Sequence, residues 1–204
     1  MIAIHETRIS PGDLIPIRDL LTISGKRIGI PTSDRLIHLQ FRRFAGCPVC
    51  DLHLYSIMQR HGEILAASIR EVVVFHSTSE ELSRYAGHLP FDVIADPGKR
   101  LYAQFGVERD CRALFDPRAW RPILIGVYRS FLRVLRREQP LPRVRPDGGS
   151  FGLPADFLIA GDGRVLACKY GSHAYDQWTV DEILEFADTR GSISQSESPA
   201  NVNT

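Results

Sequence analysis

Phe41-Arg-Arg-Phe-Ala-Gly-Cys-Pro-Val-Cys-Asp51 is the segment from which the rest of the chain can be interpreted. It ends an alternating apolar run and precedes a segment of helical periodicity, which places both cysteines where a strand gives way to a helix. The first turn of a helix has unpaired N–H groups and the positive end of the dipole, and both stabilise a thiolate. Arg42 and Arg43 add positive charge, which we expect to outweigh Asp51. We therefore expect Cys47 to be a partly exposed nucleophile with a lowered pKa.

The spacing of the two cysteines suggests a second property. Cys50 follows Cys47 by one helical turn, so their sulfur atoms can approach and close a small disulfide ring. Pro48 suits the position between them, because its φ is already helical and its missing N–H costs nothing at the first helical position. The pattern predicts a dithiol that cycles between reduced and oxidised forms, with Cys47 and Cys50 as the catalytic residues.

Two other interpretations of the cysteines remain open. A CxxC can be half of a zinc site, but structural zinc takes four ligands, and Cys111 and Cys168 are single and far apart. Two buried, inert cysteines are the other alternative, because a free cysteine is often simply a small core residue. We favour redox chemistry and expect neither a bound metal nor another cofactor.

Composition and length set wider limits. The chain has 204 residues, of which 44% are hydrophobic and 24% charged, and its net charge is +1. These values favour one domain with a substantial core, with or without an insertion, and argue against nucleic acid as a partner. The first residues do not resemble a signal peptide, and no apolar run approaches the ~18 residues of a transmembrane helix. We expect a soluble cytoplasmic protein, in which four cysteines do not form a structural disulfide framework.

Alternation of strand and helix patterns predicts an α/β fold. After a lead-in over 1–13, the expected elements are a strand hairpin over 20–30, a main strand over 36–44, a helix over 50–68, a strand over 72–75, a helix capped by Thr78 or Ser79, a strand over 91–95, a helix over 99–105, a hairpin over 155–168 and a helix over 180–187 capped by Thr179. The order implies a mostly parallel sheet in a three-layer domain over 14–190. The polar residues 191–204 predict a disordered tail.

The segment 112–146 differs from the rest because it is rich in arginine and nearly free of acids. Its pattern predicts an amphipathic basic helix followed by a proline-rich loop, forming an insertion over about 112–148. One interpretation is a solvated helix that covers the edge of the sheet. The other is a surface for a partner, either a protein, an anionic lipid or an acidic thiol such as glutathione.

A family resemblance rests on Arg43-Phe-Ala-Gly-Cys-Pro-Val-Cys50 and on Gly149-Ser-Phe-Gly-Leu-Pro-Ala-Asp-Phe-Leu-Ile159, which enters the second hairpin. Over about residues 13–188 the chain resembles the peroxiredoxin-like branch of the AhpC/TSA superfamily, which has the thioredoxin fold. The resemblance implies a three-layer α/β/α domain with an N-terminal β-hairpin and a basic helical insertion. It also implies a thiol-dependent oxidoreductase that reduces disulfides or peroxides and is reset by an external reductant of the thioredoxin or glutathione type. A homodimer is compatible with it.

The same resemblance implies roles for individual residues. Pro154 is similar in place to the cis-proline that faces the CxxC of thioredoxins, so we expect the Leu153–Pro154 bond to be cis and to lie opposite Cys47. Peroxiredoxins carry a proline and a hydroxyl residue where this chain has Gln40 and Phe44, and Arg43 is the residue that could replace them electrostatically. We therefore expect faster disulfide exchange than peroxide reduction. The rival hypothesis is a non-catalytic, redox-sensing interaction module with an arginine-rich partner surface.

Overall fold

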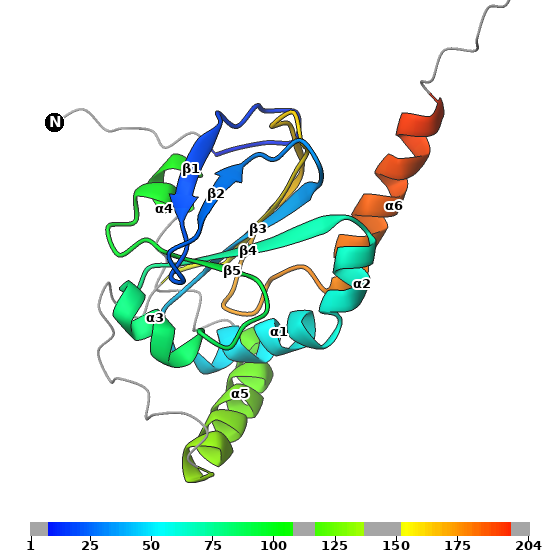
Figure 1. Ribbon diagram of the computed structural model, residues 1–204. Helices are drawn as coiled ribbons and strands as arrows, with labels where there is room; N and C mark the ends of the chain where they lie inside the picture. Colours follow the sequence, from blue (N-terminus) through cyan, green and yellow to red (C-terminus); the bar gives the residue numbers. More distant parts are fainter. Residues whose placement is uncertain (1–7, 108–116, 137–151, 197–204) are drawn as a thin grey trace, which may run out of the picture.

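The computed structural model describes residues 8–107, 117–136 and 152–196, and its main feature is a mixed sheet between two covering layers (Figure 1). The strands are β1 (Arg18–Leu21), β2 (Arg27–Ile30), β3 (Leu36–Arg42), β4 (Ile69–Phe75), β5 (Asp92–Ala95), β6 (Ala155–Ile159) and β7 (Val165–Tyr170). The helices are α1 (Pro48–Gln59), α2 (His61–Ala66), α3 (Ser79–Tyr85), α4 (Arg100–Gln104), α5 (Pro117–Leu135) and α6 (Val180–Ser196).

The sheet has β3 at its centre. Its strand order is β5-β4-β3-β6-β7, in which β3, β4 and β5 run parallel while β6 and β7 are antiparallel to their neighbours. The helices between the parallel strands make the crossovers that such pairing requires. β1 and β2 form the separate antiparallel hairpin expected near the N-terminus. This arrangement confirms the predicted thioredoxin-like α/β fold.

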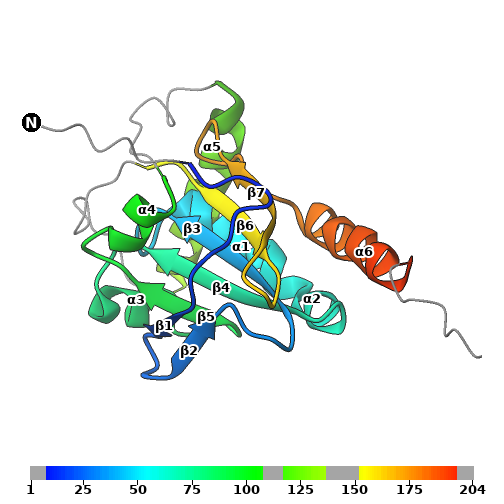
Figure 2. The same ribbon diagram turned by 90° about the horizontal axis from the view of Figure 1, so that it is seen from above.

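Each face of the sheet has its own core. One face packs under the β1–β2 hairpin and α4, with Phe41 in contact with the rings of Tyr102, Phe105 and Phe157. The other face is covered by α1, α2, α3 and α6, as the two views in Figures 1 and 2 agree. The sheet is therefore buried on both sides, which explains the continuous apolar run of β4.

The helices differ from the expected ranges at two places. The single helix predicted over 50–68 is wrong, because the chain breaks at Arg60 into α1 and α2. There the Arg60 guanidinium contacts Glu63 at 2.7 Å and Asp181 of α6 at 2.6 Å. The last helix continues past Ala187 to Ser196, so residues 191–196 are helical, whereas 197–204 of the predicted tail lie outside the described residues.

Thr78 and Thr179 both cap helices as predicted. The Thr78 hydroxyl accepts a hydrogen bond from the Glu81 N–H, and that of Thr179 accepts one from the Glu182 N–H. The Glu182 carboxylate in turn accepts a hydrogen bond from the Thr179 N–H at 2.7 Å, which completes a capping box.

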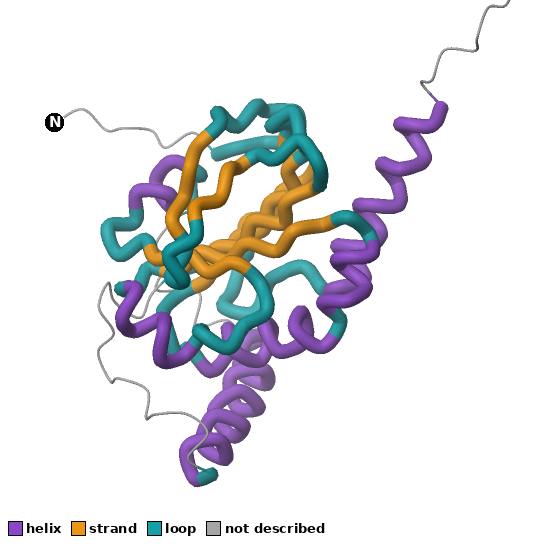
Figure 3. The backbone as a smooth tube through the Cα atoms, viewed as in Figure 1, coloured by secondary structure: helices purple, strands orange, loops and turns teal. Residues whose placement is uncertain are grey.

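α5 lies elsewhere than expected. Its helical character is confirmed, but it packs against α1 and does not cover the edge of the sheet, and it projects from the body of the domain (Figures 1 and 3). The flanking parts of the arginine-rich segment, 112–116 and 137–146, lie outside the described residues, as does Cys111.

Candidate active site

The CxxC begins α1 as the sequence predicts. Cys47 is the N-cap, with extended backbone angles of φ −66° and ψ 113°, and Pro48 is the first helical residue. The Cys47 sulfur accepts a hydrogen bond from the backbone N–H of Cys50 at 3.4 Å. This contact satisfies one of the N–H groups that a helix leaves unpaired at its start, and it places the sulfur at the positive end of the dipole.

The two sulfur atoms and one guanidinium form a compact group. Cys47 Sγ and Cys50 Sγ are 2.8 Å apart and share a hydrogen bond, and both cysteines are free thiols. Arg43 Nη2 donates to Cys47 Sγ at 3.0 Å, from a side chain that is itself buried. The structure thus brings together three of the five residues expected at the site, with Pro48 in the adjoining turn.

Neither thiol is exposed. Cys47 is 0% and Cys50 2% exposed, so the prediction of a partly exposed Cys47 is wrong. Phe44, Ile123 of α5 and Tyr175 pack around the pair. The cover follows from the position of α5. At Gly126 an added Cβ would lie only 2.6 Å from the carbonyl oxygen of Pro48, so the helix lies directly against the first turn of α1.

The pKa values of the two thiols move in opposite directions. Burial, with the neighbouring Cys50 sulfur, raises the pKa of Cys47 well above its usual range despite the charge of Arg43. At Cys50, burial is outweighed by the hydrogen bond with Cys47 and by the charge of Arg43, which lower the pKa of Cys50 to about 5. The lowering that we expected at Cys47 therefore falls on Cys50.

The hydrogen-bond donors instead favour a negative charge on Cys47, because the Arg43 guanidinium and the Cys50 N–H both point at Cys47 Sγ. A proton shared across 2.8 Å reconciles the two observations. The pair ionises as a unit, with its first proton lost below the usual thiol pKa because of Arg43. The second is lost above it because two adjacent charges repel.

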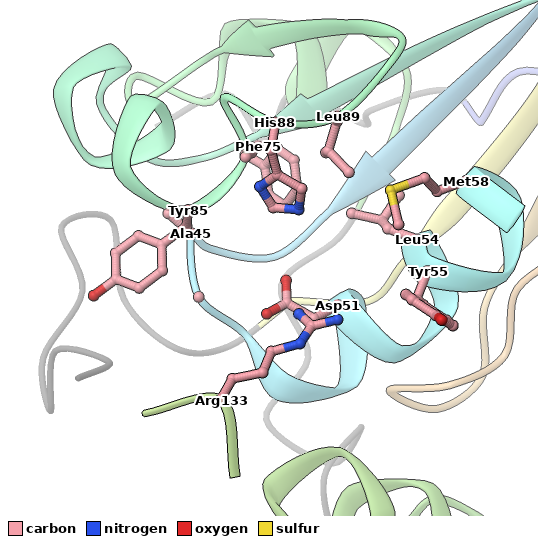
Figure 4. Close-up of a pocket in the computed structure, with 12 residues that line it drawn as sticks. Ala45, Asp51, Leu54, Tyr55, Met58, Phe75, Tyr85, His88, Leu89 and Arg133 are labelled. Atoms are coloured by element: carbon pink, nitrogen blue, oxygen red, sulfur yellow. The ribbon is translucent and has the colours of Figure 1, made fainter. Parts of the chain in front are cut away.

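A small pocket lies beside the cysteines between α1, α3 and α5 (Figure 4). The Asp51 carboxylate points into it and faces the guanidinium of Arg133. Burial and the charge of Cys50 raise the pKa of Asp51 to about 7, although Arg133 acts in the other direction. Near neutral pH this carboxyl is therefore partly protonated, which reduces its opposition to a nearby thiolate.

A buried polar network that was not predicted from the sequence lies on the sheet beneath α1. Arg42 Nη2 contacts Asp156 Oδ1 at 2.6 Å, and the two nitrogens of His38 contact Glu71 at 2.9 Å and Asp156 at 3.3 Å. Gln40 donates to Glu71 and accepts from Arg42. Four of these side chains are 0% exposed and Glu71 is 1% exposed.

The signal for this network was present in the alternation of β3. His38, Gln40 and Arg42 alternate with apolar residues, which would normally indicate one face in water. Both faces are buried here, so the polar residues had to find acidic partners on the neighbouring strands. Asp156 within the otherwise apolar β6 was the second sign.

One expectation about the other site residues is contradicted. The Leu153–Pro154 bond is trans, because the cis bond in the described part of the chain is Ile30–Pro31, so the expected cis-proline is wrong. Pro154 is buried, and its carbonyl accepts from the Gly171 N–H at 2.9 Å. Gln40 belongs to the network below the site, whereas Phe44 packs on the cysteines.

Metal ligands do not gather elsewhere in the part of the chain that the structure describes. Within it, no three His, Cys, Asp or Glu side chains are placed to hold an ion. Cys168 is a half-buried free thiol on β7, and its sulfur contacts the carbonyl oxygen of Ile9 at 3.4 Å.

Several solved structures share the fold. Peroxidoxin BcpB from Mycobacterium tuberculosis aligns with a TM-score of 0.62 and 14% identity, over 89% of this chain and 98% of that one. Reduced 2-Cys peroxiredoxin from Plasmodium vivax aligns with a TM-score of 0.62 and 13% identity, over 95% and 89% of the two chains. A thiol:disulfide interchange protein DsbE from Chlorobium tepidum aligns with a TM-score of 0.55 and 16% identity, over 88% and 99%.

Sequence comparisons give a narrower result. A search of the curated proteins finds no match to the chain. The family model described as "AhpC/TSA antioxidant enzyme" matches residues 56–173, a range that begins after the CxxC and ends just beyond β7. The match spans more than half of the sequence and is consistent with the fold and with a thiol-dependent redox function. The chain belongs to the AhpC/TSA antioxidant enzyme family.

Proposed function

We propose that the protein is a thiol-disulfide oxidoreductase in which Cys47 attacks the substrate and Cys50 resolves the intermediate. One observation carries the proposal: the two sulfur atoms lie 2.8 Å apart with the guanidinium of Arg43 3.0 Å from one of them. Such a group can hold one negative charge and one proton, which is the state that thiol exchange requires. The family membership supports thiol chemistry over an inert interaction module.

With a disulfide substrate the steps are two exchanges. Cys47 transfers its proton to Cys50 and attacks one sulfur of the substrate, which breaks the S–S bond and releases one half as a thiolate. Cys50 then loses its proton to that thiolate or to water and attacks Cys47, which releases the second half and leaves a Cys47–Cys50 disulfide. An external dithiol or two monothiols supply the two electrons that restore the pair.

With a peroxide the same pair would react through oxygen. The Cys47 thiolate attacks one peroxide oxygen, the O–O bond breaks, and the leaving oxygen takes a proton to become an alcohol or water. Cys50 then displaces water from the Cys47 sulfenic acid, and the disulfide forms. The hydroxyl that would orient a peroxide has no equivalent at Phe44, and losing one such donor typically costs ~10²–10³ in rate. We therefore propose disulfide reduction as the faster reaction.

The Cys50→Ser variant separates the two reactions. In a background with Cys111→Ser and Cys168→Ser, it should form a stable mixed disulfide with glutathione disulfide or an aromatic disulfide, detected by mass spectrometry. It should form sulfenic acid only slowly with hydrogen peroxide. The matched control, Cys47→Ser in the same background, should trap neither product efficiently.

Peroxide oxidation of the Cys50→Ser variant at rates far above those of a free thiolate would make the protein a peroxidase first. Equal trapping by the Cys47→Ser variant would reverse the roles of the two cysteines. A wild-type pair that reacts with neither class of oxidant would leave the non-catalytic module as the correct description.

A further inference from the structure

One side of α5 carries an exposed apolar stripe that nothing in the described part of the chain covers. Six large side chains are between 51% and 70% exposed: Trp120, Leu124, Val127, Tyr128, Phe131 and Leu135. At 3.6 residues per turn they occupy about 100° of the helix surface. Gly126 and Ser130 are buried on another side of the helix, and Gly126 meets α1. The stripe therefore points away from the domain.

The concentration is unusual within this molecule. Of the large hydrophobic side chains that are exposed in the described ranges, seven lie on α5, while the other five are spread over the lead to β1, β1, α1 and α2. Scattered apolar residues are normal on a surface, but a contiguous row marks a contact with another molecule or with a membrane. We therefore expect another molecule or a membrane to cover the stripe.

Charge distinguishes between two candidate partners for the stripe, a second copy of the chain and a lipid surface. Between Pro117 and Leu135 the helix has four arginines and no acidic residue. Arg121 is exposed beside the stripe, whereas the guanidinium groups of Arg129 and Arg133 lie over the ring of Tyr55 on α1. A symmetric contact with a second copy would bring the same positive charges together. A surface of lipid phosphates would neutralise them, because a long arginine stem can lie along apolar material while its guanidinium reaches a phosphate.

We propose that α5 is an amphipathic anchor that lies in the plane of an anionic phospholipid surface. The stripe would enter the boundary between headgroups and acyl chains, where the amphipathic rings of Trp120 and Tyr128 are favoured. No helix in the described ranges is both long and apolar enough to cross a bilayer, so the contact is with the surface. Because Ile123 of α5 packs on the Cys47–Cys50 pair, binding would bring the thiols close to the bilayer.

The test is flotation of the full chain with vesicles. We expect binding to vesicles that mix phosphatidylcholine with phosphatidylglycerol, little binding to phosphatidylcholine alone, and weaker binding at high salt. The double variant Leu124→Glu/Phe131→Glu should lose binding. Arg121→Ala should weaken it by roughly fivefold. The matched control Ile17→Glu changes a side chain that is 83% exposed but lies outside α5, and it should bind like the wild type.

A second readout comes from the two tryptophans. Trp120 is 59% exposed on the stripe and Trp178 is 4% exposed in the core, so transfer into lipid should shift the emission of Trp120 alone to shorter wavelength. Brominated lipids should quench that signal. Retained circular dichroism in the glutamate variant confirms that it folds. The Cys47→Ser variant should bind vesicles normally, which separates this proposal from the proposed function.

Three results would overturn the proposal. The first is no binding of the wild type to anionic vesicles, and the second is unchanged binding of the Leu124→Glu/Phe131→Glu variant. The third is a wild-type dimer that the glutamate variant converts to a monomer, without any vesicle binding. In that case a second copy of the chain occupies the stripe.

Discussion

Arg43 Nη2 lies 3.0 Å from Cys47 Sγ, and the two residues are separated by only three others in the turn between β3 and α1. The arginine follows the central strand directly, and its carbonyl accepts the backbone N–H of His76 at 3.1 Å. The charge that supports the thiol pair is therefore held by the sheet and does not depend on a distant loop.

Replacing Arg43 should raise the pKa at which the pair loses its first proton. A hydrogen bond to a charged group contributes about 1.5–3 kcal/mol, and one pKa unit corresponds to about 1.4 kcal/mol, so Arg43→Gln should shift this pKa upward by at least roughly one unit. Thiolate absorbance and alkylation rate against pH measure the shift. Arg43→Lys, which keeps the charge, should show a smaller one. An unchanged titration in Arg43→Gln would mean that the arginine does not stabilise the anion.

Breaking the buried pair of Arg42 and Asp156 should be costly. Asp156→Asn leaves an uncompensated guanidinium in the core, which typically costs about 3–5 kcal/mol, whereas removing both charges costs less than the sum of the single changes. Denaturant unfolding of Arg42→Met, of Asp156→Leu and of the double variant Arg42→Met/Asp156→Leu tests this. The matched control is Arg84→Ala, which removes the exposed pair with Glu80 at 2.6 Å and should change stability little. Strict additivity would contradict the coupling.

The contribution of His38 to the free energy of unfolding should decline as the pH rises. Burial alone would lower its pKa, but Glu71 and Asp156 outweigh it and raise the pKa to about 9. Because the folded value lies above the unfolded value of about 6.5, the stabilisation is complete below pH 6.5 and is lost as the pH passes 9.

The difference in the free energy of unfolding between wild type and His38→Gln should therefore shrink between pH 6 and pH 9.5. Taking this difference largely cancels the titration of other groups, including the cysteine pair. A difference that stays constant or grows with pH would show that His38 is neutral in the folded protein.

Gly126→Ala should loosen the contact between α5 and α1. The new methyl group would lie 2.6 Å from the Pro48 carbonyl oxygen, so one helix must move. We expect a lower free energy of unfolding and faster alkylation of Cys47. Gly62→Ala is the matched control, because its new methyl group meets nothing within 4 Å, and alanine is the better helix former. Equal effects of the two changes would indicate that the close approach is unimportant.

The sequence could predict whatever depends on local patterns. The hairpin over β1 and β2, the start of α1 at Pro48 and the caps at Thr78 and Thr179 follow from turn residues, periodicity and hydroxyl side chains. These features involve residues close together in the chain. Their physical causes are therefore visible in short windows of sequence.

What the sequence could not predict depends on long-range packing. The burial of Cys47 results from α5, which lies some 70 residues further along the chain. The apolar pattern of α5 does not indicate which element of the fold it packs against. The polar network likewise needs the pairing of β3 with both β4 and β6, which brings His38 to Glu71 and Asp156. The bond before Pro154 is trans, so the resemblance to thioredoxins did not predict its isomer correctly.

Because the two thiols are covered, their observed rate constant depends on both the intrinsic rate constant and the fraction of molecules in which the cover is open. An oxidant can reach Cys47 only in the fraction of molecules in which Phe44, Ile123 or Tyr175 has moved aside, and the observed rate constant is the intrinsic one multiplied by that fraction. If about one molecule in a hundred is open, the observed rate is about a hundredth of the intrinsic rate. Small oxidants need a smaller opening than folded protein disulfides do. If Cys47 attacks the substrate as proposed, this cover would favour small disulfides over folded protein disulfides.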